Sequence, residues 1–217
     1  MYKYILFDLD GTLTDPGLGI TNSAAYALKH WGIEETDRNK LYKFIGPPLI
    51  SSFEIFYGFS HEDALKALEI YREYFGEKGI FENRLLDGVR EMLDQLRKMG
   101  KTLILATSKP DLYSLQIIEH YGIAEYFTFC SCATMEETRT DKAEVIEYAL
   151  ESCGITDRAA CLMVGDREHD VNGARKCGID VVGVLCGYGS EEELTSAGAT
   201  YVVKDITDVL KIVNDNE

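Results

Sequence analysis

Apolar and amphipathic segments alternate in a regular order from Gly88 to the C-terminus of this chain. Each amphipathic segment ends in a glycine, and a short run rich in Ile, Val and Leu follows within a few residues. Glycine suits the left-handed conformation that closes a helix, and the runs after it have the composition of buried strands. The predicted strands are Leu103–Ala106, Phe127–Cys130, Cys161–Val164, Val181–Leu185 and Tyr201–Val203, preceded by Tyr4–Phe7 near the N-terminus.

This alternation predicts a fold of the α/β class. Strands that are apolar on both faces and separated by helices form a parallel sheet covered by helices on both faces. We therefore expect a Rossmann-like parallel core. In such sheets ligands bind at the carboxyl ends of the strands, so polar residues at those ends are candidates for function.

Residues from about 18 to 80 follow a different pattern, with helical periodicity and no convincing strand. Candidate helices are Ile20–Trp31, Pro48–Tyr57 and His61–Phe75, and glycines or the Gly46-Pro47-Pro48 turn separate them. We therefore predict an inserted α-helical domain of residues 16–82. Residues 1–15 and 83–217 would form the α/β core.

Composition narrows the range of partners. The 217 residues include 46% hydrophobic ones, enough for a sizeable core. The net charge of −15 argues against a nucleic-acid partner, because phosphate backbones bind surplus Lys and Arg. No run approaches the roughly 18 apolar residues of a membrane helix, so we expect a cytoplasmic protein without membrane contact. We expect a monomer or a homodimer.

Directly after the first predicted strand comes the polar segment Asp8-Leu9-Asp10-Gly11-Thr12. It places two carboxylates at a strand end, an arrangement that suits metal-dependent phosphoryl transfer. Asp8 can serve as nucleophile and metal ligand, and Asp10 can move protons, while Gly11 lets the chain turn sharply. Asp and Gly are also common in ordinary turns, so this motif has a structural alternative.

Two further candidates follow later in the chain. In Thr107-Ser108-Lys109-Pro110, a hydroxyl and backbone N–H groups suit phosphate oxygens, although Thr or Ser there could equally cap a helix beginning near Asp111. Lys142 stands at the predicted start of a helix, where the helix dipole does not favour a cation. The alternative for Lys142 is a solvated surface lysine.

The segment after Cys161–Val164 is Gly165-Asp166-Arg167-Glu168-His169-Asp170. Two acids four residues apart suit a divalent cation, with Asp166 as a direct ligand and Asp170 orienting it or a bound water. Acids near a helix N-terminus are also favourable on structural grounds, by about 0.3–1 kcal/mol each. Four different strand ends thus predict one pocket, which would hold Asp8, Asp10, Thr107, Lys142, Asp166 and Asp170.

The order and spacing of these motifs resemble the haloacid dehalogenase superfamily of phosphohydrolases. Its motifs are D-x-D-G-T, a Thr or Ser after a strand, a Lys, and an acidic G-D-x-x-x-D. The resemblance covers nearly the whole chain, and the helical insertion resembles that superfamily's cap domain. The segment Phe44–Leu49, which includes Gly46 and Pro47, resembles phosphoglycolate phosphatase-like and bacterial 5'-nucleotidase-like members, and its structural alternative is a rigid link between helices. The segment Gly187-Tyr188-Gly189 resembles the phosphoglycolate group, and its alternative is an ordinary turn.

By this resemblance the chain is a Mg²⁺-dependent phosphatase that forms an aspartyl phosphate on Asp8. Asp10 would protonate the leaving oxygen and then deprotonate the hydrolytic water. The resemblance further implies two sets of binding residues. Mg²⁺ would be held by Asp8, the main-chain carbonyl of Asp10, Asp166 and Asp170, and the substrate by Thr107, Ser108, Lys109, Lys142, Gly11, Gly46 and Pro47.

The sequence also departs from the family at two positions, and alternatives remain. Ser108 stands where relatives often carry Asn, and Ala143 follows Lys142 where many have Pro. A dehalogenase or a phosphonate hydrolase usually lacks an acid at the position of Asp10, whereas a sugar phosphomutase keeps every motif. A phosphate-ligand binding module without turnover is the non-enzymatic alternative. Among small phosphorylated metabolites we expect phosphoglycolate first and nucleoside monophosphates second.

Overall fold

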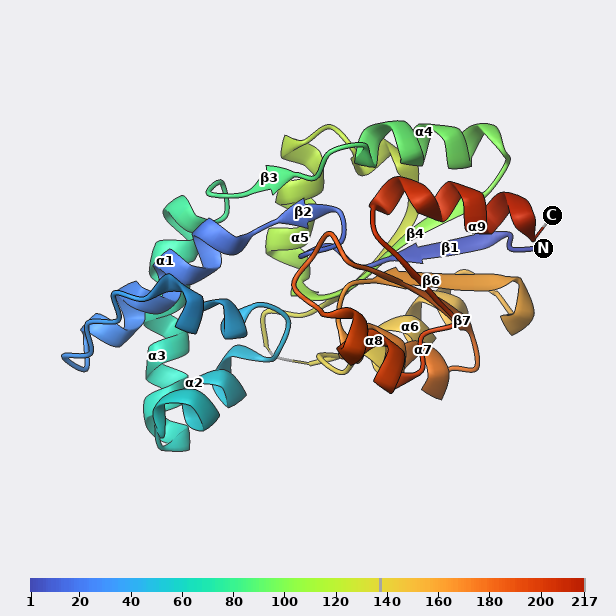
Figure 1. Cartoon of the computed structure of the whole chain (residues 1–217). Coiled ribbons are helices and arrows are strands. Elements are labelled where there is room, and N and C mark those ends of the chain that lie inside the picture. Colours follow the sequence, from blue (N-terminus) through green and yellow to red (C-terminus); the bar gives the residue numbers. More distant parts are fainter. Residues whose placement is uncertain (137, 217) are drawn as a thin grey trace. The chain divides into compact units, whose positions relative to one another are not determined.

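The computed structural model describes residues 1–136 and 138–216 (Figure 1). By internal contacts the chain forms two compact units, one of Met1–Thr14 with Leu85–Glu217 and the other of Asp15–Arg84. We call them the core unit and the insertion unit. The sequence placed the crossings at 15/16 and 82/83, close to these limits. A short two-stranded sheet, β2 (Thr14–Asp15) with β3 (Arg84–Leu85), lies where the chain leaves and re-enters the core unit.

A six-stranded sheet forms the middle of the core unit, in the order β5-β4-β1-β6-β7-β8. Every neighbouring pair in it is parallel. The strands are β1 (Tyr4–Phe7), β4 (Thr102–Pro110), β5 (Phe127–Ala133), β6 (Cys161–Gly165), β7 (Asp180–Val184) and β8 (Tyr201–Val203). The predicted α/β fold with a parallel core is therefore confirmed.

The register of β1 decides where polar residues gather. Phe7, the last residue of β1, lies level with Leu105 of β4 and Val164 of β6. Asp8 follows Phe7 at once, and the Asp8 N–H donates to the Val164 carbonyl at 2.9 Å. The polar segments after β1, β4 and β6 therefore emerge at the same edge of the sheet.

Helices cover both faces of this sheet. Figure 1 shows α4 and α9 above it and α6, α7 and α8 below it. The helices of the core unit are α4 (Val89–Lys98), α5 (Asp111–His120), α6 (Lys142–Ser152), α7 (Glu168–Lys176), α8 (Glu191–Ala197) and α9 (Val209–Asp215).

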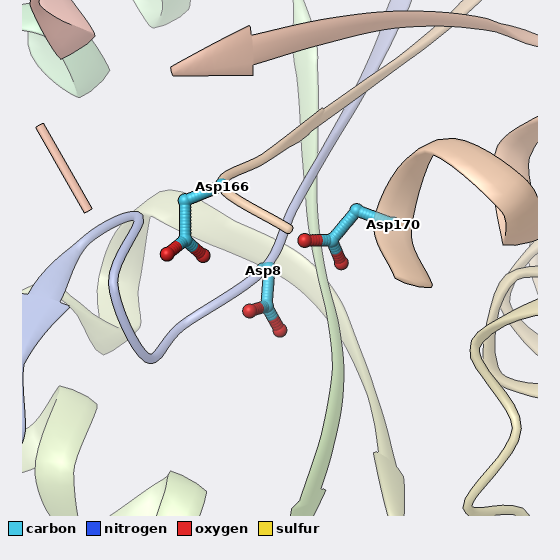
Figure 2. A group of neighbouring side chains, drawn as sticks. All are labelled: Asp8, Asp166 and Asp170. Carbon is cyan, nitrogen blue, oxygen red and sulfur yellow. The ribbon is translucent and has the colours of Figure 1, made fainter. Parts of the chain in front are cut away.

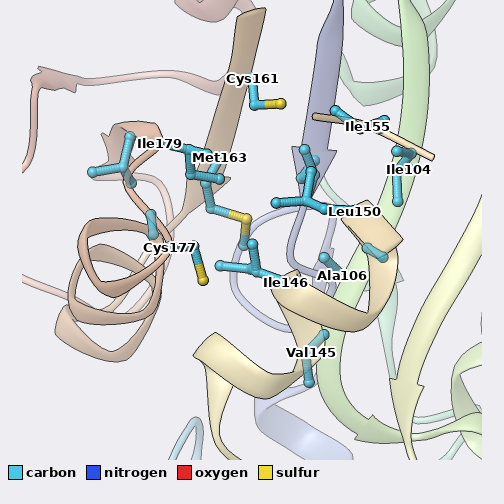
Figure 3. Close-up of a cluster of buried hydrophobic side chains, with 14 of the residues drawn as sticks. Ile104, Ala106, Val145, Ile146, Leu150, Ile155, Cys161, Met163, Cys177 and Ile179 are labelled. Atoms are coloured by element: carbon cyan, nitrogen blue, oxygen red, sulfur yellow. The ribbon is translucent and has the colours of Figure 1, made fainter. Parts of the chain in front are cut away.

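One face of the sheet packs on α6, α7 and α8 through a continuous apolar cluster (Figure 3). Leu6, Ile104 and Met163 enter it from three neighbouring strands, and Ile146 and Leu150 enter it from α6. All five side chains are fully buried. Since side chains alternate along a strand, the residues beside Leu6 face the opposite layer, which is why β1 is apolar throughout.

The insertion unit is helical, as its periodicity predicts. Its helices are α1 (Gly17–Lys29), α2 (Leu49–Tyr57) and α3 (His61–Tyr74), with short turns η1 (Arg38–Lys40) and η2 (Tyr42–Phe44) and a π-helical turn η3 (Phe75–Gly79). Ser60 begins α3 because its hydroxyl accepts the Asp63 N–H at 3.1 Å. None of the described helices combines the length and the apolar character needed to span a bilayer.

Three elements, α1, β4 and β5, extend at least three residues beyond one of their predicted limits. Helix α1 begins at Gly17, three residues before the predicted Ile20, because the Asp15 side chain accepts the Gly17 N–H at 3.1 Å and starts the first turn. Strand β4 runs on to Pro110, because β5 continues to pair beside it up to Ala133. Thr107, Ser108 and Lys109 therefore lie within the last residues of β4.

We expect Leu6→Ala to lower the free energy of unfolding by about 2–5 kcal/mol, since it empties a buried site in the central strand. Urea denaturation followed by circular dichroism measures this loss. Leu115→Ala is the control, because Leu115 is 46% exposed and should cost less than about 0.5 kcal/mol. Equal losses in the two variants would contradict the placement of β1 at the centre of the core.

Candidate active site

A buried ion-pair network occupies the edge of the sheet in the core unit. Lys142, the first residue of α6, is only 7% exposed. Its Nζ donates to Asp8 Oδ1 at 2.6 Å and to the Ala106 carbonyl at 3.1 Å, and lies 2.9 Å from Asp170 Oδ1. Lys142 is therefore a buried member of the acidic site, and the surface alternative is wrong.

Three of the sequence-predicted acids surround one small space. Figure 2 shows Asp8 from the end of β1, Asp166 from the end of β6 and Asp170 from the first turn of α7. Each of them offers a carboxylate oxygen within 4.8 Å of those of the other two, and all three residues are buried. Carboxylate oxygens at this spacing suit a hard divalent cation.

A backbone N–H and a side-chain hydroxyl hold the two oxygens of Asp166. The Tyr188 N–H donates to Asp166 Oδ2 at 2.8 Å, and the Thr12 hydroxyl donates to Oδ1 at 3.3 Å. A side chain at Gly187 would place its Cβ 2.3 Å from Oδ2, and one at Gly11 would lie 2.2 Å from the same atom. Glycine is therefore needed at both positions for the backbone to close around this carboxylate.

Asp8, Asp166 and Asp170 form what we call the three-carboxylate group, and its electrostatics favour a bound cation. Burial raises the pKa of Asp166 well above its ordinary value, and the nearby Asp170 and Asp8 raise it further. Burial also raises the pKa of Asp170, against the opposing effect of Lys142. For Lys142, burial lowers the pKa but Asp170 and Asp8 raise it by more, so the amine stays charged. A cation among the carboxylates would relieve the remaining repulsion.

Asp10 lies beside this group in a separate ion pair. Lys109 Nζ is 2.7 Å from Asp10 Oδ2, and the two side chains are 7% and 15% exposed. Burial raises the pKa of Asp10, Lys109 lowers it and Asp8 raises it, with a net upward shift. Asp10 therefore holds a proton at higher pH than an ordinary aspartate does.

The phosphate-binding candidates of β4 lie at the same edge. Thr107 is 2% exposed, and its hydroxyl accepts the Lys109 N–H at 3.2 Å. Neither Thr107 nor Ser108 caps α5, whose N-terminal flanking residue is Pro110. The capping alternative for this segment is therefore wrong, and phosphate binding by Thr107 and Ser108 stays a prediction.

The other implied substrate contacts fall in two places. Gly11 turns the chain after Asp10 with φ = 83° and packs against Asp166. Gly46 and Pro47 lie in the insertion unit, between η2 and α2. Gly46 has φ = 105°, a conformation that favours glycine. Substrate contact by these residues stays a prediction.

The sequence interpretation missed three features of this site. It assigned no role to the Thr12 hydroxyl, it left the Gly187–Gly189 segment as a resemblance, and it did not pair Lys109 with Asp10. The close spacing of Gly187 and Gly189 was the available signal for a tight approach. The Tyr188 contact uses a main-chain N–H, which leaves no mark on residue type.

Comparison with known proteins now adds to this geometry. Residues 5–184 match the family model described as haloacid dehalogenase-like hydrolase. The chain belongs to the haloacid dehalogenase-like hydrolase family. This membership confirms the predicted resemblance and the prediction of a hydrolase, and it rules against the binding module as the class of this protein.

Several relatives carry phosphatase names, and a relative of Mycobacterium tuberculosis that is 36% identical over 207 residues, covering 94% of this chain and 69% of the relative, is named a tyrosine-protein kinase. A 5'-nucleotidase of Pseudomonas aeruginosa is 42% identical over 215 residues, which cover 99% of this chain and 97% of the relative. A phosphoglycolate phosphatase of Vibrio parahaemolyticus is 27% identical, with 97% and 96% covered. The crystal structure of a predicted phosphatase from Clostridium acetobutylicum superposes with a TM-score of 0.95 at 44% identity and covers 99% of both chains.

We expect metal-free Asp166→Asn to be more stable than the wild type at pH 7, with a midpoint of thermal unfolding higher by at least about 2 °C. The amide removes a buried charge that Asp170 and Asp8 repel. Because the folded-state pKa of Asp166 lies above its ordinary 3.8, stability present at low pH is lost as the pH rises through the raised value. Thermal unfolding in EDTA from pH 4 to pH 8 measures this.

When Mg²⁺ replaces the EDTA, it should stabilise the wild type and leave Asp166→Asn unchanged. Asp94→Asn is the matched control, because Asp94 is a partly exposed acid of α4 whose side chain pairs with Lys98. A variant that is stabilised by Mg²⁺ as strongly as the wild type would contradict a role for Asp166 as a metal ligand.

Proposed function

We propose that this protein is a Mg²⁺-dependent phosphomonoesterase that hydrolyses a small phosphate ester through an aspartyl phosphate. The observation that supports it most directly is the position of Asp8. Its carboxylate belongs to the three-carboxylate group and also accepts the Lys142 N–H at 2.6 Å. A carboxylate that faces both an ammonium group and a cation site is well placed to act as a nucleophile.

In the first step an Asp8 oxygen attacks phosphorus, and the bond from phosphorus to the ester oxygen breaks. Asp10 gives its proton to that leaving oxygen, so an alcohol departs. The raised pKa of Asp10 fits this task, because a general acid must hold its proton near the working pH.

In the second step water attacks the phosphorus of the aspartyl phosphate. Asp10, now ionised, takes the proton from the water, and the bond to Asp8 breaks. Inorganic phosphate and both original carboxyl groups result. Lys142 balances negative charge throughout, and the Thr107 hydroxyl with the Ser108 backbone holds phosphate oxygens.

A metal ion fits the residues present. Oxygen donors from Asp8, Asp166 and Asp170 converge, and burial leaves their charges poorly solvated. The three carboxylates of Asp8, Asp166 and Asp170 face the ammonium group of Lys142, so negative charge remains for a divalent cation. Bound Mg²⁺ would neutralise phosphoryl oxygens during transfer.

The insertion unit is proposed to select the leaving group. Its position in the chain, directly after the D-x-D-G-T motif, matches the cap domains that the family resemblance implies. Gly46 and Pro47 are the proposed contacts of this unit with substrate. Such a unit would exclude bulk water and so protect the aspartyl phosphate until the hydrolytic water attacks it.

For the substrate, the relatives shift the order expected from sequence. The 42% identical relative is named a 5'-nucleotidase, and the relative named a phosphoglycolate phosphatase is 27% identical. We therefore propose nucleoside 5'-monophosphates first and 2-phosphoglycolate second. Both are small monoesters with an alcohol leaving group, so both need the proton that Asp10 supplies.

We expect purified protein with Mg²⁺ to release phosphate from at least one ester of a panel of nucleoside 5'-monophosphates, 2-phosphoglycolate, glucose phosphates, benzyl phosphate and p-nitrophenyl phosphate. Asp8→Asn should reduce kcat at least about a thousandfold, since it removes the nucleophile. Mass spectrometry of wild-type protein quenched in acid during turnover should show one added phosphoryl group on Asp8.

Asp94→Asn serves again as the control and should keep full activity, because it removes a partly exposed acid of α4 that pairs with Lys98. Folded protein that releases no phosphate from any ester would contradict the proposal. Phosphate exchange that depends on an added sugar bisphosphate would indicate a phosphomutase in its place.

A further inference from the structure

The ion pair between Lys109 and Asp10 is directional. Lys109 Nζ donates to Oδ2 of Asp10 at 2.7 Å. Oδ1 of the same carboxylate is buried and has no hydrogen-bond partner among the described residues. The two oxygens of Asp10 therefore differ, because one is bonded to an ammonium group and the other is open to a proton.

Lys109 is itself fixed by the end of β4. Its side chain is 7% exposed, and its main-chain N–H donates to the Thr107 hydroxyl at 3.2 Å. The pair joins the end of β4 to the turn after β1, two segments whose strands are hydrogen-bonded neighbours. A buried charge-assisted bond of this kind restricts rotation of the carboxylate about its last bond.

We infer that Lys109 is a positioning residue that holds Asp10 by Oδ2 and so reserves Oδ1 for proton exchange with the leaving oxygen and with water. This inference rests on the proposed function. It differs from the expectation that Lys109 binds substrate, because the amine here acts through Asp10. Lys109 should then matter most for substrates whose leaving group needs a proton.

Two esters of similar size distinguish a Lys109 that positions Asp10 from a Lys109 that binds substrate. Benzyl phosphate leaves as an alcohol and needs the proton, whereas p-nitrophenyl phosphate leaves as a stable phenolate without it. The ratio kcat/KM reports the steps up to formation of the aspartyl phosphate. We expect Lys109→Met to lower kcat/KM for benzyl phosphate about 30-fold or more, and for p-nitrophenyl phosphate less than about threefold.

The second step supplies an independent readout. Hydrolysis of the aspartyl phosphate needs Asp10 as a base whatever the leaving group was. Lys109→Met should therefore release one equivalent of p-nitrophenol per enzyme in a rapid burst, followed by slow turnover, when mixed with p-nitrophenyl phosphate in a stopped-flow instrument. Loss of stability alone would produce neither the burst nor the difference between esters.

Lys98→Met is the matched control, since Lys98 pairs with Asp94 on the surface of α4 and its loss should leave both ratios unchanged. If circular dichroism shows Lys109→Met to be folded, an equal fall in kcat/KM for both esters, or no fall for either, would overturn the inference while the proposed function stands. A wild type that releases phosphate from no ester of the panel would instead remove the proposed function, and this inference with it.

Discussion

The buried amine of Lys142 is the interaction on which the rest of the site depends. It stands at the first position of α6, where the helix dipole disfavours a cation by itself. Three oxygen atoms, from Asp8, Asp170 and the Ala106 carbonyl, outweigh that effect. Helix α7 can approach this amine closely because Gly173 lacks a side chain, and a Cβ there would lie 2.7 Å from the Lys142 side chain. The burial of the Lys142 charge and the packing of α6 against α7 therefore depend on each other.

The acids next to Lys142 are placed by backbone more than by side chains. Asp166 receives a main-chain N–H and is enclosed by glycine backbone, and Asp170 accepts the Arg167 N–H at 3.1 Å. Main-chain groups at the ends of strands move less than long side chains do. They can therefore hold carboxylates close together, despite their mutual repulsion, with little further loss of conformational entropy. The uncompensated repulsion makes the same group receptive to a cation.

Much of the fold could be predicted from the sequence, because short apolar runs such as those of β1, β6 and β7, separated by helical segments, are typical of a buried parallel sheet. The positions of the polar segments after β1 and β6 could be predicted for the same reason. The end of β4 could not be predicted, since its last residues are polar and extend only because β5 pairs beside them. Nor could the partner of Lys109, because a long flexible side chain reaches many positions from one backbone point. The implied metal, phosphate and cap contacts remain predictions.

The paired strands β2 and β3 have a consequence for how such proteins diversify. They bring the two ends of the insertion unit together, and the Leu86 N–H donates to the Leu13 carbonyl at 3.0 Å just inside the core unit. A segment whose ends are already neighbours can be lengthened, shortened or exchanged as a cassette, since loop closure adds little cost with length. Evolution can thus exchange the insertion unit while the core unit and its acidic site stay unchanged.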